Sequence, residues 1–297
     1  MSGDEIERAA IDLYDRYAHH GMDRRLFMTE LTRLCGGAAA ATMMLSGIAC
    51  SASEPQVAAE DNRIATENAE VQAAPGRAYR VYRARPAGST WRNPAVIVIH
   101  ENRGLTDHIR DVTRRLAVAG FAAEAPDMLS VAGGTPVDED RARQMIGALD
   151  MVQTVADGVA LIRDFATRSM NHRKVGIVGF CWGGAMVNRL AVAAGAELSA
   201  GVAYYGPAPD PAEAARVEAA MLLHYAGNDA RVNATGEPWA AALRAAGKDV
   251  TAITYPGVDH AFNNDTSAAR YNREAAERAW TTTLEFFRRH LGEPAPG

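Results

Sequence analysis

The sequence lacks several features that would point to particular classes of protein. It has only three cysteines in 297 residues, and two of them, Cys35 and Cys50, lie near the N-terminus, so we expect no disulfide framework. The formal net charge is −5 and no long basic run occurs, which argues against a nucleic-acid partner. No His, Cys or carboxylate cluster has ligand spacing, so we expect no metal and no other cofactor.

The overall composition is that of a globular protein. Hydrophobic residues make up 48% of the chain and charged residues 23%, which is close to the average for folded domains. A chain of 297 residues is longer than most domains, although α/β folds often form a single domain of 200 to 250 residues. We therefore expect one catalytic domain with an extension.

The N-terminal residues 1–50 have the layout of an export signal. The segment Asp23-Arg24-Arg25-Leu26-Phe27-Met28 precedes an uncharged stretch, 34–50, that is rich in Ala, Gly and Met. It resembles a twin-arginine leader, with Asp23 where Ser or Thr is usual. Because the stretch is shorter than the roughly 20 residues of a spanning helix, we expect no stable membrane span. The leader would engage the export machinery and direct the protein to the periplasm or outside.

Other interpretations of this region stay open. Cys50 follows Leu45-Ser46-Gly47-Ile48-Ala49, which faintly resembles a lipid-attachment site. Alternatively, the acidic N-terminus forms an amphipathic helix that packs on the domain of a cytoplasmic protein. Residues 51–74 are small and polar without a period, so we predict a linker there and a domain over 75–292.

The remaining chain predicts an α/β fold. Arg77–Pro86 alternates in polarity and ends at a turn, which is typical of a leading antiparallel strand. Short apolar runs then alternate with helical patterns, which predicts a mostly parallel, doubly wound sheet with helices on both faces. In such a sheet, functional groups gather at the carboxyl ends of the strands. The predicted strands are 95–99, 121–125, 175–180, 201–205, 221–225 and 250–255.

Cys181 is the candidate nucleophile. It stands in Gly179-Phe180-Cys181-Trp182-Gly183, a Gly-x-nucleophile-x-Gly turn in which larger residues at the glycine positions would collide with neighbouring elements. The N-terminus of the following helix favours the thiolate, and the backbone N–H of Trp182 would donate to an oxyanion. A buried cysteine is more often a small core residue. The strand before Cys181 and the helical stretch after it favour the nucleophile.

Asp229 and His260 follow the nucleophile in the order that a hydrolase of this kind needs. Each comes directly after a predicted strand. His260 would take the thiol proton, and Asp229 would orient the imidazole and stabilise its charged form. Alternatively, Asp229 only forms a turn and His260 is only a loop residue. Asp259 is a competing acid, but its side chain should point away from that of His260.

Glu101 follows the strand 95–99, at the place where the second oxyanion donor of such a site arises. We expect that donor to be the backbone N–H of Asn102. The Glu101 carboxylate would hydrogen-bond the Cys181 thiol or accept its proton. The alternative is a solvated loop acid paired with Arg103 or Arg110.

At these residues the chain resembles the dienelactone hydrolase family, a branch of the α/β-hydrolases, over roughly residues 75–292. The motifs that carry the resemblance are Glu101 with Gly104, Pro126-Asp127, Gly179 to Gly184, and the loops of Asp229 and His260. The resemblance implies an α/β-hydrolase fold. It also implies a Cys-Asp-His triad that cleaves an enol-lactone through an acyl-enzyme, and a glutamate that interacts with the cysteine and helps to control its ionisation. These roles correspond to Cys181, Asp229, His260 and Glu101.

The chain departs from the family at the substrate carboxylate. Family members that act on dienelactone hold this group with arginines, one of which lies four residues beyond the histidine. Asn264 occupies that place here. Arg141 or Arg143 is a candidate for the other arginine and for substrate binding. The resemblance therefore favours a different lactone or ester as the small-molecule substrate.

The main hypothesis from the sequence is a hydrolase in which Cys181 attacks an ester or lactone and forms a thioester acyl-enzyme. A second hypothesis is a non-catalytic protein that binds a ligand on the same fold. A third is a redox-sensing thiol, which the lack of a resolving cysteine near Cys181 disfavours.

Overall fold

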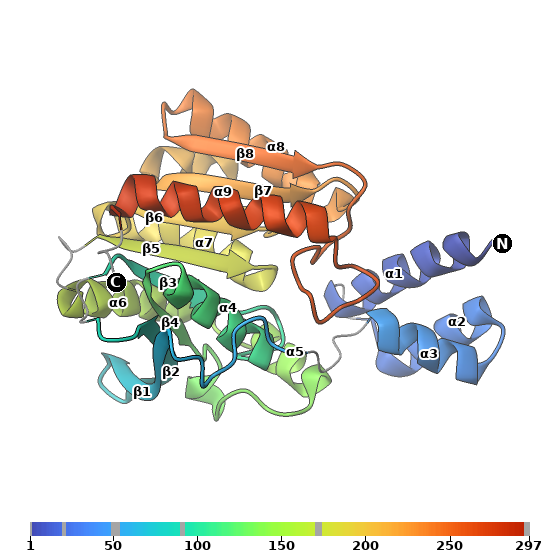
Figure 1. Cartoon of the computed structure of the whole chain (residues 1–297). Helices are drawn as coiled ribbons and strands as arrows, with labels where there is room; N and C mark the ends of the chain where they lie inside the picture. Colours follow the sequence, from blue (N-terminus) through green and yellow to red (C-terminus); the bar gives the residue numbers. More distant parts are fainter. Residues whose placement is uncertain (1, 20–21, 49–53, 90–92, 170–173, 294–297) are drawn as a thin grey trace.

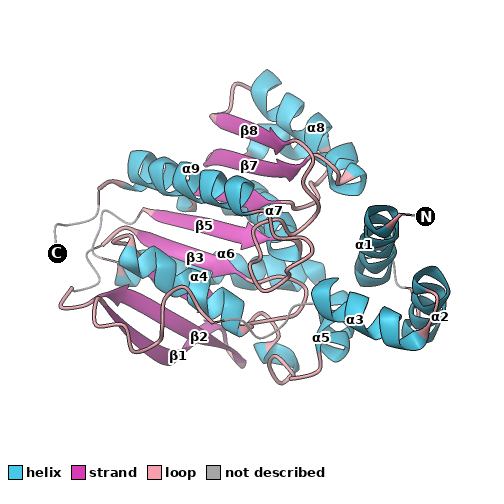
Figure 2. Ribbon diagram, turned by 45° about the vertical axis from the view of Figure 1, so that its right-hand side comes forward, coloured by secondary structure: helices cyan, strands magenta, loops and turns pink. Residues whose placement is uncertain are grey.

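The computed structural model describes residues 2–19, 22–48, 54–89, 93–169 and 174–293. At its centre lies an eight-stranded sheet in the order β1-β2-β4-β3-β5-β6-β7-β8 (Figures 1 and 2). The first two strands run antiparallel to their neighbours, and the strands from β4 to β8 are parallel. The strands are β1 (Ile64–Ala74), β2 (Arg77–Pro86), β3 (Ala95–Ile99), β4 (Ala122–Pro126), β5 (Val175–Phe180), β6 (Ala200–Tyr204), β7 (Ala220–Ala226) and β8 (Val250–Tyr255).

The predicted mostly parallel, doubly wound sheet is therefore confirmed. Strands β2, β3, β5 and β8 have the bounds expected from the sequence, and the other three predicted strands differ from the structure by one residue at each end. The six residues of β5 are all buried, as are all five of β3. Continuous apolar runs of this kind are typical of parallel strands that are covered on both faces.

Strand β1 corrects one expectation. Residues 64–74 were predicted to belong to a linker, but they pair with β2 across the turn at Gly76, which has a φ of 74°. Of the eleven residues of β1, only Ile64 and Val71 are buried. An edge strand that covers so little apolar surface has a weak alternating pattern, so its sequence resembles a linker.

Helices cover both faces of the sheet (Figure 1). On one face, α6 (Met151–Arg168), α7 (Trp182–Ala194) and α8 (Ala230–Ala245) contribute side chains such as Phe165, Leu190 and Trp239 to the core. On the other face, α4 (Asp107–Val118) and α9 (Arg273–Leu291) contribute Leu116 and Phe287 to a second core cluster. The two layers hold the central strands in place, and with them the loops that follow their carboxyl ends.

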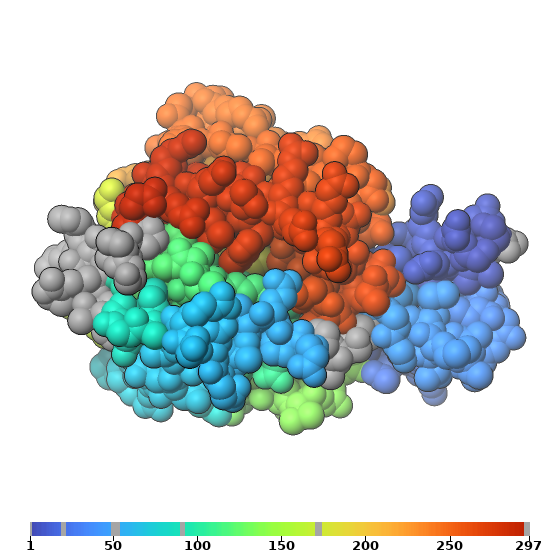
Figure 3. Space-filling model, in the orientation of Figure 1, coloured from blue at the N-terminus to red at the C-terminus, as the bar shows by residue number. Residues whose placement is uncertain are grey.

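Three N-terminal helices form a lobe against one side of this body, which is blue in Figure 3. They are α1 (Gly3–His19), α2 (Arg24–Cys35) and α3 (Ala38–Ile48). They share a small core in which the rings of Tyr17 and Phe27 stack at 4.4 Å. Arg24 forms an ion pair with Asp140 of α5 (Glu139–Gly147), which joins the lobe to the sheet domain. This packing is the arrangement that the amphipathic-helix alternative predicts.

Within the described residues, no single helix combines the length and apolar composition needed to cross a bilayer. Helices α5 and α6 would meet the requirement only together, and they are bent by 99°. Cys50, the faint lipid-attachment candidate, lies outside the described residues.

A buried ion cluster ties the sheet to the helices. The side chain of Glu124 in β4 is fully buried and accepts hydrogen bonds from Arg83 of β2 at 3.1 Å and from Arg168 of α6 at 2.9 Å. A buried carboxylate is tolerated when cations and hydrogen bonds surround it, and removing it leaves their charges uncompensated.

We expect Glu124→Ala to lower the free energy of unfolding by about 3 kcal/mol, because Arg83 and Arg168 lose their shared counter-charge. Urea denaturation followed by circular dichroism measures the change. The matched control is Glu197→Ala, which removes the carboxylate of the exposed pair with Arg163 and should cost at most about 1 kcal/mol. Equal losses in the two variants would contradict the role given to Glu124.

Candidate active site

Cys181 lies in a strained turn between β5 and α7. Its backbone has φ 56° and ψ −113°, a conformation that non-glycine residues rarely adopt. A Cβ at Gly179 would lie 2.2 Å from the backbone oxygen of Gly183, and a Cβ at Gly183 would lie 2.3 Å from that of Ile99. No side chain fits at either glycine, as the sequence pattern predicts. The tight turn places Cys181 at the carboxyl edge of the sheet.

His260 and Asp229 meet beside this turn. Asp229 follows β7 as the N-cap residue of α8, where its Oδ1 accepts the N–H of Val232 at 3.1 Å. Its Oδ2 lies 2.5 Å from Nδ1 of His260, which comes from the loop after β8. This contact leaves the other ring nitrogen of His260 for Cys181, and His260 and Cys181 line the same small cavity. The structure therefore brings these predicted residues together.

His260 and Asp229 each favour the charged form of the other. Burial by itself would lower the pKa of His260, but negative charge on Cys181 and Asp229, with hydrogen bonds to both, raises it to about 10. Burial would likewise raise the pKa of Asp229, but the charge of His260 and its hydrogen bond outweigh that effect and lower it. The arrangement therefore favours a charged imidazolium of His260 next to an ionised Asp229.

Asp259, the competing acid, points elsewhere. Its Oδ1 accepts a hydrogen bond from Asn228 at 2.9 Å, and its side chain is more exposed than that of His260. The expectation that it points away from its neighbour is confirmed.

Glu101 is a buried part of this site. Its side chain is only 7% exposed, and its Oε2 accepts a hydrogen bond from Nδ2 of Asn264 at 2.8 Å. Its Oε1 has no hydrogen-bond partner within the described part of the chain. The alternative of a solvated acid paired with Arg103 or Arg110 is not what the structure shows, because those side chains pair with Glu139 and Asp107. Asn264 thus binds the glutamate from the loop that also carries His260.

The two residues expected to supply oxyanion donors are the residue after Cys181 and a residue that lines its cavity. Trp182 is the first residue of α7, where backbone N–H groups have no partner within the helix. Its ring stacks on His100 at 5.5 Å. Asn102 lines the cavity that contains Cys181 and His260. The Nδ2 of Asn102 donates to the carbonyl of Ala18 in α1 at 3.3 Å.

Asp127 braces the loop that carries Glu101. Its carboxylate accepts hydrogen bonds from the N–H and hydroxyl of Thr135, both at 2.8 Å. The Thr135 hydroxyl in turn accepts the N–H of Leu105 at 2.9 Å. A Cβ at Gly104, whose φ is 80°, would lie 2.2 Å from this hydroxyl. The Pro126-Asp127 motif therefore supports the shape of the site.

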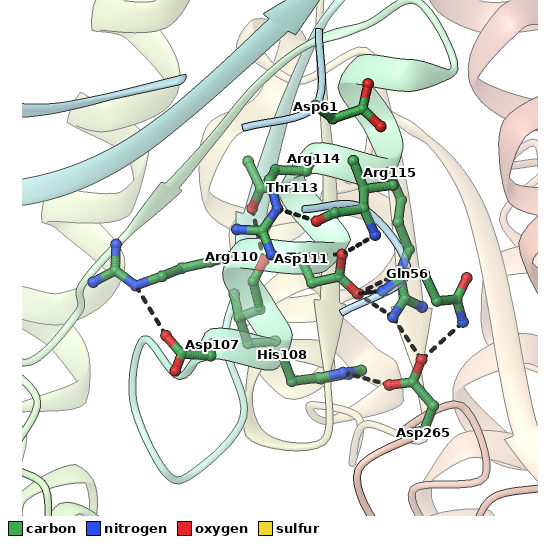
Figure 4. Close-up of polar contacts among 12 residues, drawn as sticks. Gln56, Asp61, Asp107, His108, Arg110, Asp111, Thr113, Arg114, Arg115 and Asp265 are labelled. Carbon is green, nitrogen blue, oxygen red and sulfur yellow. Dashed lines mark hydrogen bonds and ion pairs between the residues drawn. The ribbon is translucent and has the colours of Figure 1, made fainter. Parts of the chain in front are cut away.

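A second polar network holds the loop of Asn264 (Figure 4). Asp265 lies 3.0 Å from His108, 2.6 Å from Arg115 and 2.8 Å from the amide of Gln56. Burial would raise the pKa of Asp265, but the hydrogen bond from His108 and the charge of Arg115 lower it well below its usual range. The network links α4 to the loop after β8, and so fixes Asn264 next to Glu101.

Arg143 lies away from Cys181. It forms an ion pair with Asp140 and lies 4.2 Å from the ring centre of Tyr17, at the contact between α5 and the N-terminal helices. It does not line the cavity at Cys181. Arg141 is exposed. The structure therefore brings neither predicted substrate-binding arginine to the site.

Other residues at the site were not foreseen from the sequence. Tyr205 follows β6 with a φ of 37°, and its buried ring lies 5.0 Å from that of His260. Its place at the carboxyl end of a central strand was the available signal. Tyr14 and Arg270 also line the cavity of Cys181. No local pattern relates Tyr14, in the first helix, to a loop more than two hundred residues away.

Two neighbouring cavities of very different volume lie at the site. The cavity at Cys181 has a volume of about 10 Å³, which is room for roughly one water molecule. A polar cavity of about 570 Å³ lies beside it and shares Glu101 and Arg103 with it. Among the described residues, no group of three or more His, Cys, Asp or Glu is placed to hold a metal ion.

We expect Cys181→Ala to lower the pKa of His260 from about 10 toward its usual range, because the variant removes one of the two groups whose interactions raise it and leaves the burial that lowers it. Titration of the imidazole by NMR measures this value. Cys35→Ala, which removes a free thiol in α2, is the control and should leave the titration unchanged. An unaltered His260 pKa in Cys181→Ala would show that the two side chains do not interact.

Comparison with known proteins identifies the family of this chain. The model of the Dienelactone hydrolase family matches residues 79–291. A carboxymethylenebutenolidase homologue of Escherichia coli strain K12 is 35% identical over 230 residues, which cover 71% of this chain and 83% of that protein. A homologue from Saccharolobus solfataricus is 33% identical and is covered to 92%.

Solved structures give the same result for the fold. A dienelactone hydrolase homologue of Klebsiella pneumoniae superposes with a TM-score of 0.67 at 30% identity, covering 76% of this chain and 99% of its own. The sheet and its surrounding helices have the α/β-hydrolase fold, as expected from the sequence. The chain belongs to the dienelactone hydrolase family, whose members are hydrolases.

Proposed function

We propose that the protein hydrolyses a carboxylic ester or lactone with Cys181 as nucleophile, His260 as acid and base, and Asp229 as the group that orients His260. The observation that carries this proposal is the 2.5 Å contact between Asp229 and His260 beside the strained turn of Cys181. In a family of hydrolases, this arrangement suits nucleophilic catalysis.

The reaction has two halves. The thiolate of Cys181 attacks the carbonyl carbon and forms a tetrahedral oxyanion, which the backbone N–H groups of Trp182 and Asn102 stabilise. The C–O bond breaks, the departing alkoxide takes a proton from His260, and a thioester remains. Water then loses a proton to His260 and attacks the thioester. The C–S bond breaks, which releases the carboxylic acid and restores the thiolate.

Glu101 has a supporting role in this proposal. Its buried carboxylate, held by Asn264, lines the cavity of Cys181 and controls the charge next to the thiol. Because Asn264 stands where relatives acting on dienelactone have an arginine, we propose a substrate other than dienelactone.

We also propose that residues 1–50 include a twin-arginine-like leader recognised by the export machinery, which gives a periplasmic or exported protein. The arginine pair before an uncharged helix supports the leader. The docked N-terminal lobe supports the cytoplasmic alternative. Fractionation of the producing cell, with N-terminal sequencing of the recovered protein, distinguishes the two.

We expect Cys181→Ala to reduce hydrolysis of p-nitrophenyl acetate by about 10³-fold or more, because no other group can form the acyl-enzyme. Stopped-flow absorbance measures turnover, and intact mass spectrometry of the quenched wild-type protein should show an acetyl adduct on Cys181. Cys35→Ala is the control and should retain both. Retained turnover in Cys181→Ala would refute the proposal, and a bound ligand without any adduct would favour a binding protein.

Asp229→Asn should lower kcat by about 10²- to 10⁴-fold, because His260 loses the anion that orients it and stabilises its charge. The matched control is Asp259→Asn on the loop of His260. Asp259 bonds Asn228 rather than the histidine, so this change should leave kcat within about twofold of wild type. If the two variants lost activity equally, the role given to Asp229 would be wrong.

A further inference from the structure

Helix α1 lies across the mouth of the active site. Tyr14 and Ala18, which are one turn apart on this helix, line the same cavity as Cys181 and His260. The carbonyl of Ala18 accepts a hydrogen bond from Asn102, and the hydroxyl of Tyr14 accepts one from Arg103 at 2.5 Å. The N-terminal helix thus contacts the loop that carries the expected oxyanion donor.

The same helix also contacts the loop of His260. Asp15 lies 3.8 Å from Arg270 in an ion pair, and the guanidinium of Arg270 lies 5.1 Å from the ring centre of Tyr14. Burial raises the pKa of the Asp15 carboxyl, while the charges of His260 and Arg270 act in the opposite direction. The ion pair and the ring contact therefore place α1 against the loop that carries His260.

With α1 in this position, the cavity at the thiol of Cys181 has no room for an ester. Cys181 is 5% exposed and His260 is 2% exposed. The cavity of about 10 Å³ at the thiol holds roughly one water molecule, whereas ligand pockets usually measure about 300 Å³ or more. An ester can therefore reach Cys181 only if a wall of the cavity moves.

Helix α1 is the wall best suited to move. Its apolar residues pack mainly within the small core shared with α2 and α3, separate from the two cores of the sheet domain. Its contacts with the two catalytic loops are polar, and such contacts can exchange with water at little net cost. The other walls belong to loops that the buried sheet and the Asp127 and Asp265 networks hold in place.

We propose that helix α1 is a lid on the active site, with Tyr14 and Asp15 as the residues that hold it closed and restrict access to Cys181 by size. The closed lid leaves space for water at the thiol, and opening admits the acyl group and the leaving group. The lid acts in the form of the protein that retains residues 1–50. Its catalytic consequence rests on the proposed function, whereas access to the thiol does not.

The first test compares two charge reversals on α1 in the full-length protein. Asp15→Arg places a second cation beside Arg270 and should open the lid, whereas Asp12→Arg makes the same change on the exposed face of the helix. The readout is the rate at which Cys181 reacts with iodoacetamide, followed on its own peptide by mass spectrometry. We expect at least about a tenfold increase for Asp15→Arg and none for Asp12→Arg.

A second variant distinguishes wider access to Cys181 from a purely electrostatic effect on the alkylation rate. An added arginine near Cys181 could speed alkylation electrostatically, but that effect would be similar for neutral reagents of any size. Tyr14→Ala adds no charge and removes the ring between Arg103 and Arg270. This variant exposes the cavity of Cys181 in either case, because α1 leaves the site both when the lid loosens and when the three-helix lobe unfolds. Both variants should therefore accelerate a bulky maleimide more than iodoacetamide.

Turnover distinguishes this proposal from the proposed function. If both hold, Asp15→Arg and Tyr14→Ala increase kcat/KM more for p-nitrophenyl octanoate than for p-nitrophenyl acetate. Faster alkylation without hydrolysis by any variant supports the lid and refutes the hydrolase. The lid proposal is wrong if both variants alkylate Cys181 at the wild-type rate with both reagents. This holds even when the wild-type protein hydrolyses the esters.

Discussion

The backbone conformation at Cys181 is the constraint on which the rest of this structure depends. A φ of 56° between a buried strand and a helix requires that no side chain stand at Gly179 or Gly183, because the backbones pass too close. The turn is held by the parallel strands around it, since the N–H of Cys181 donates to the carbonyl of Tyr204 at 3.0 Å. The sheet thus maintains a strained residue that an isolated turn would not.

The loops that face this turn are held by buried charges as well as by apolar packing. Asp127 shapes the loop of Glu101, and Asp265 ties the loop of Asn264 to α4. Glu101 and Asn264 then meet at 2.8 Å although they lie 163 residues apart. Buried polar groups of this kind are costly unless they are paired, so each network stabilises one arrangement of the loops over others. The precision of the site comes from these pairs.

Much of the fold could be predicted because its signals are local. The buried strands are continuous apolar runs, and the turn at Cys181 has its own glycine pattern. Strand β1 was missed because an edge strand buries few residues. The placement of Arg143 was missed because one of its partners, Tyr17, lies in α1 and meets α5 only when the N-terminal lobe docks.

The sequence by itself determined the sheet, the nucleophile turn and the chain order of Cys181, Asp229 and His260, because periodicity and turn chemistry act over a few residues. Only the tertiary structure decided that Asn264 binds Glu101 and that Tyr14 lines the cavity of Cys181. Those contacts join residues far apart in the chain, and their formation depends on packing and on the pairing of buried charges. Neither leaves a pattern that can be recognised in a single segment of sequence.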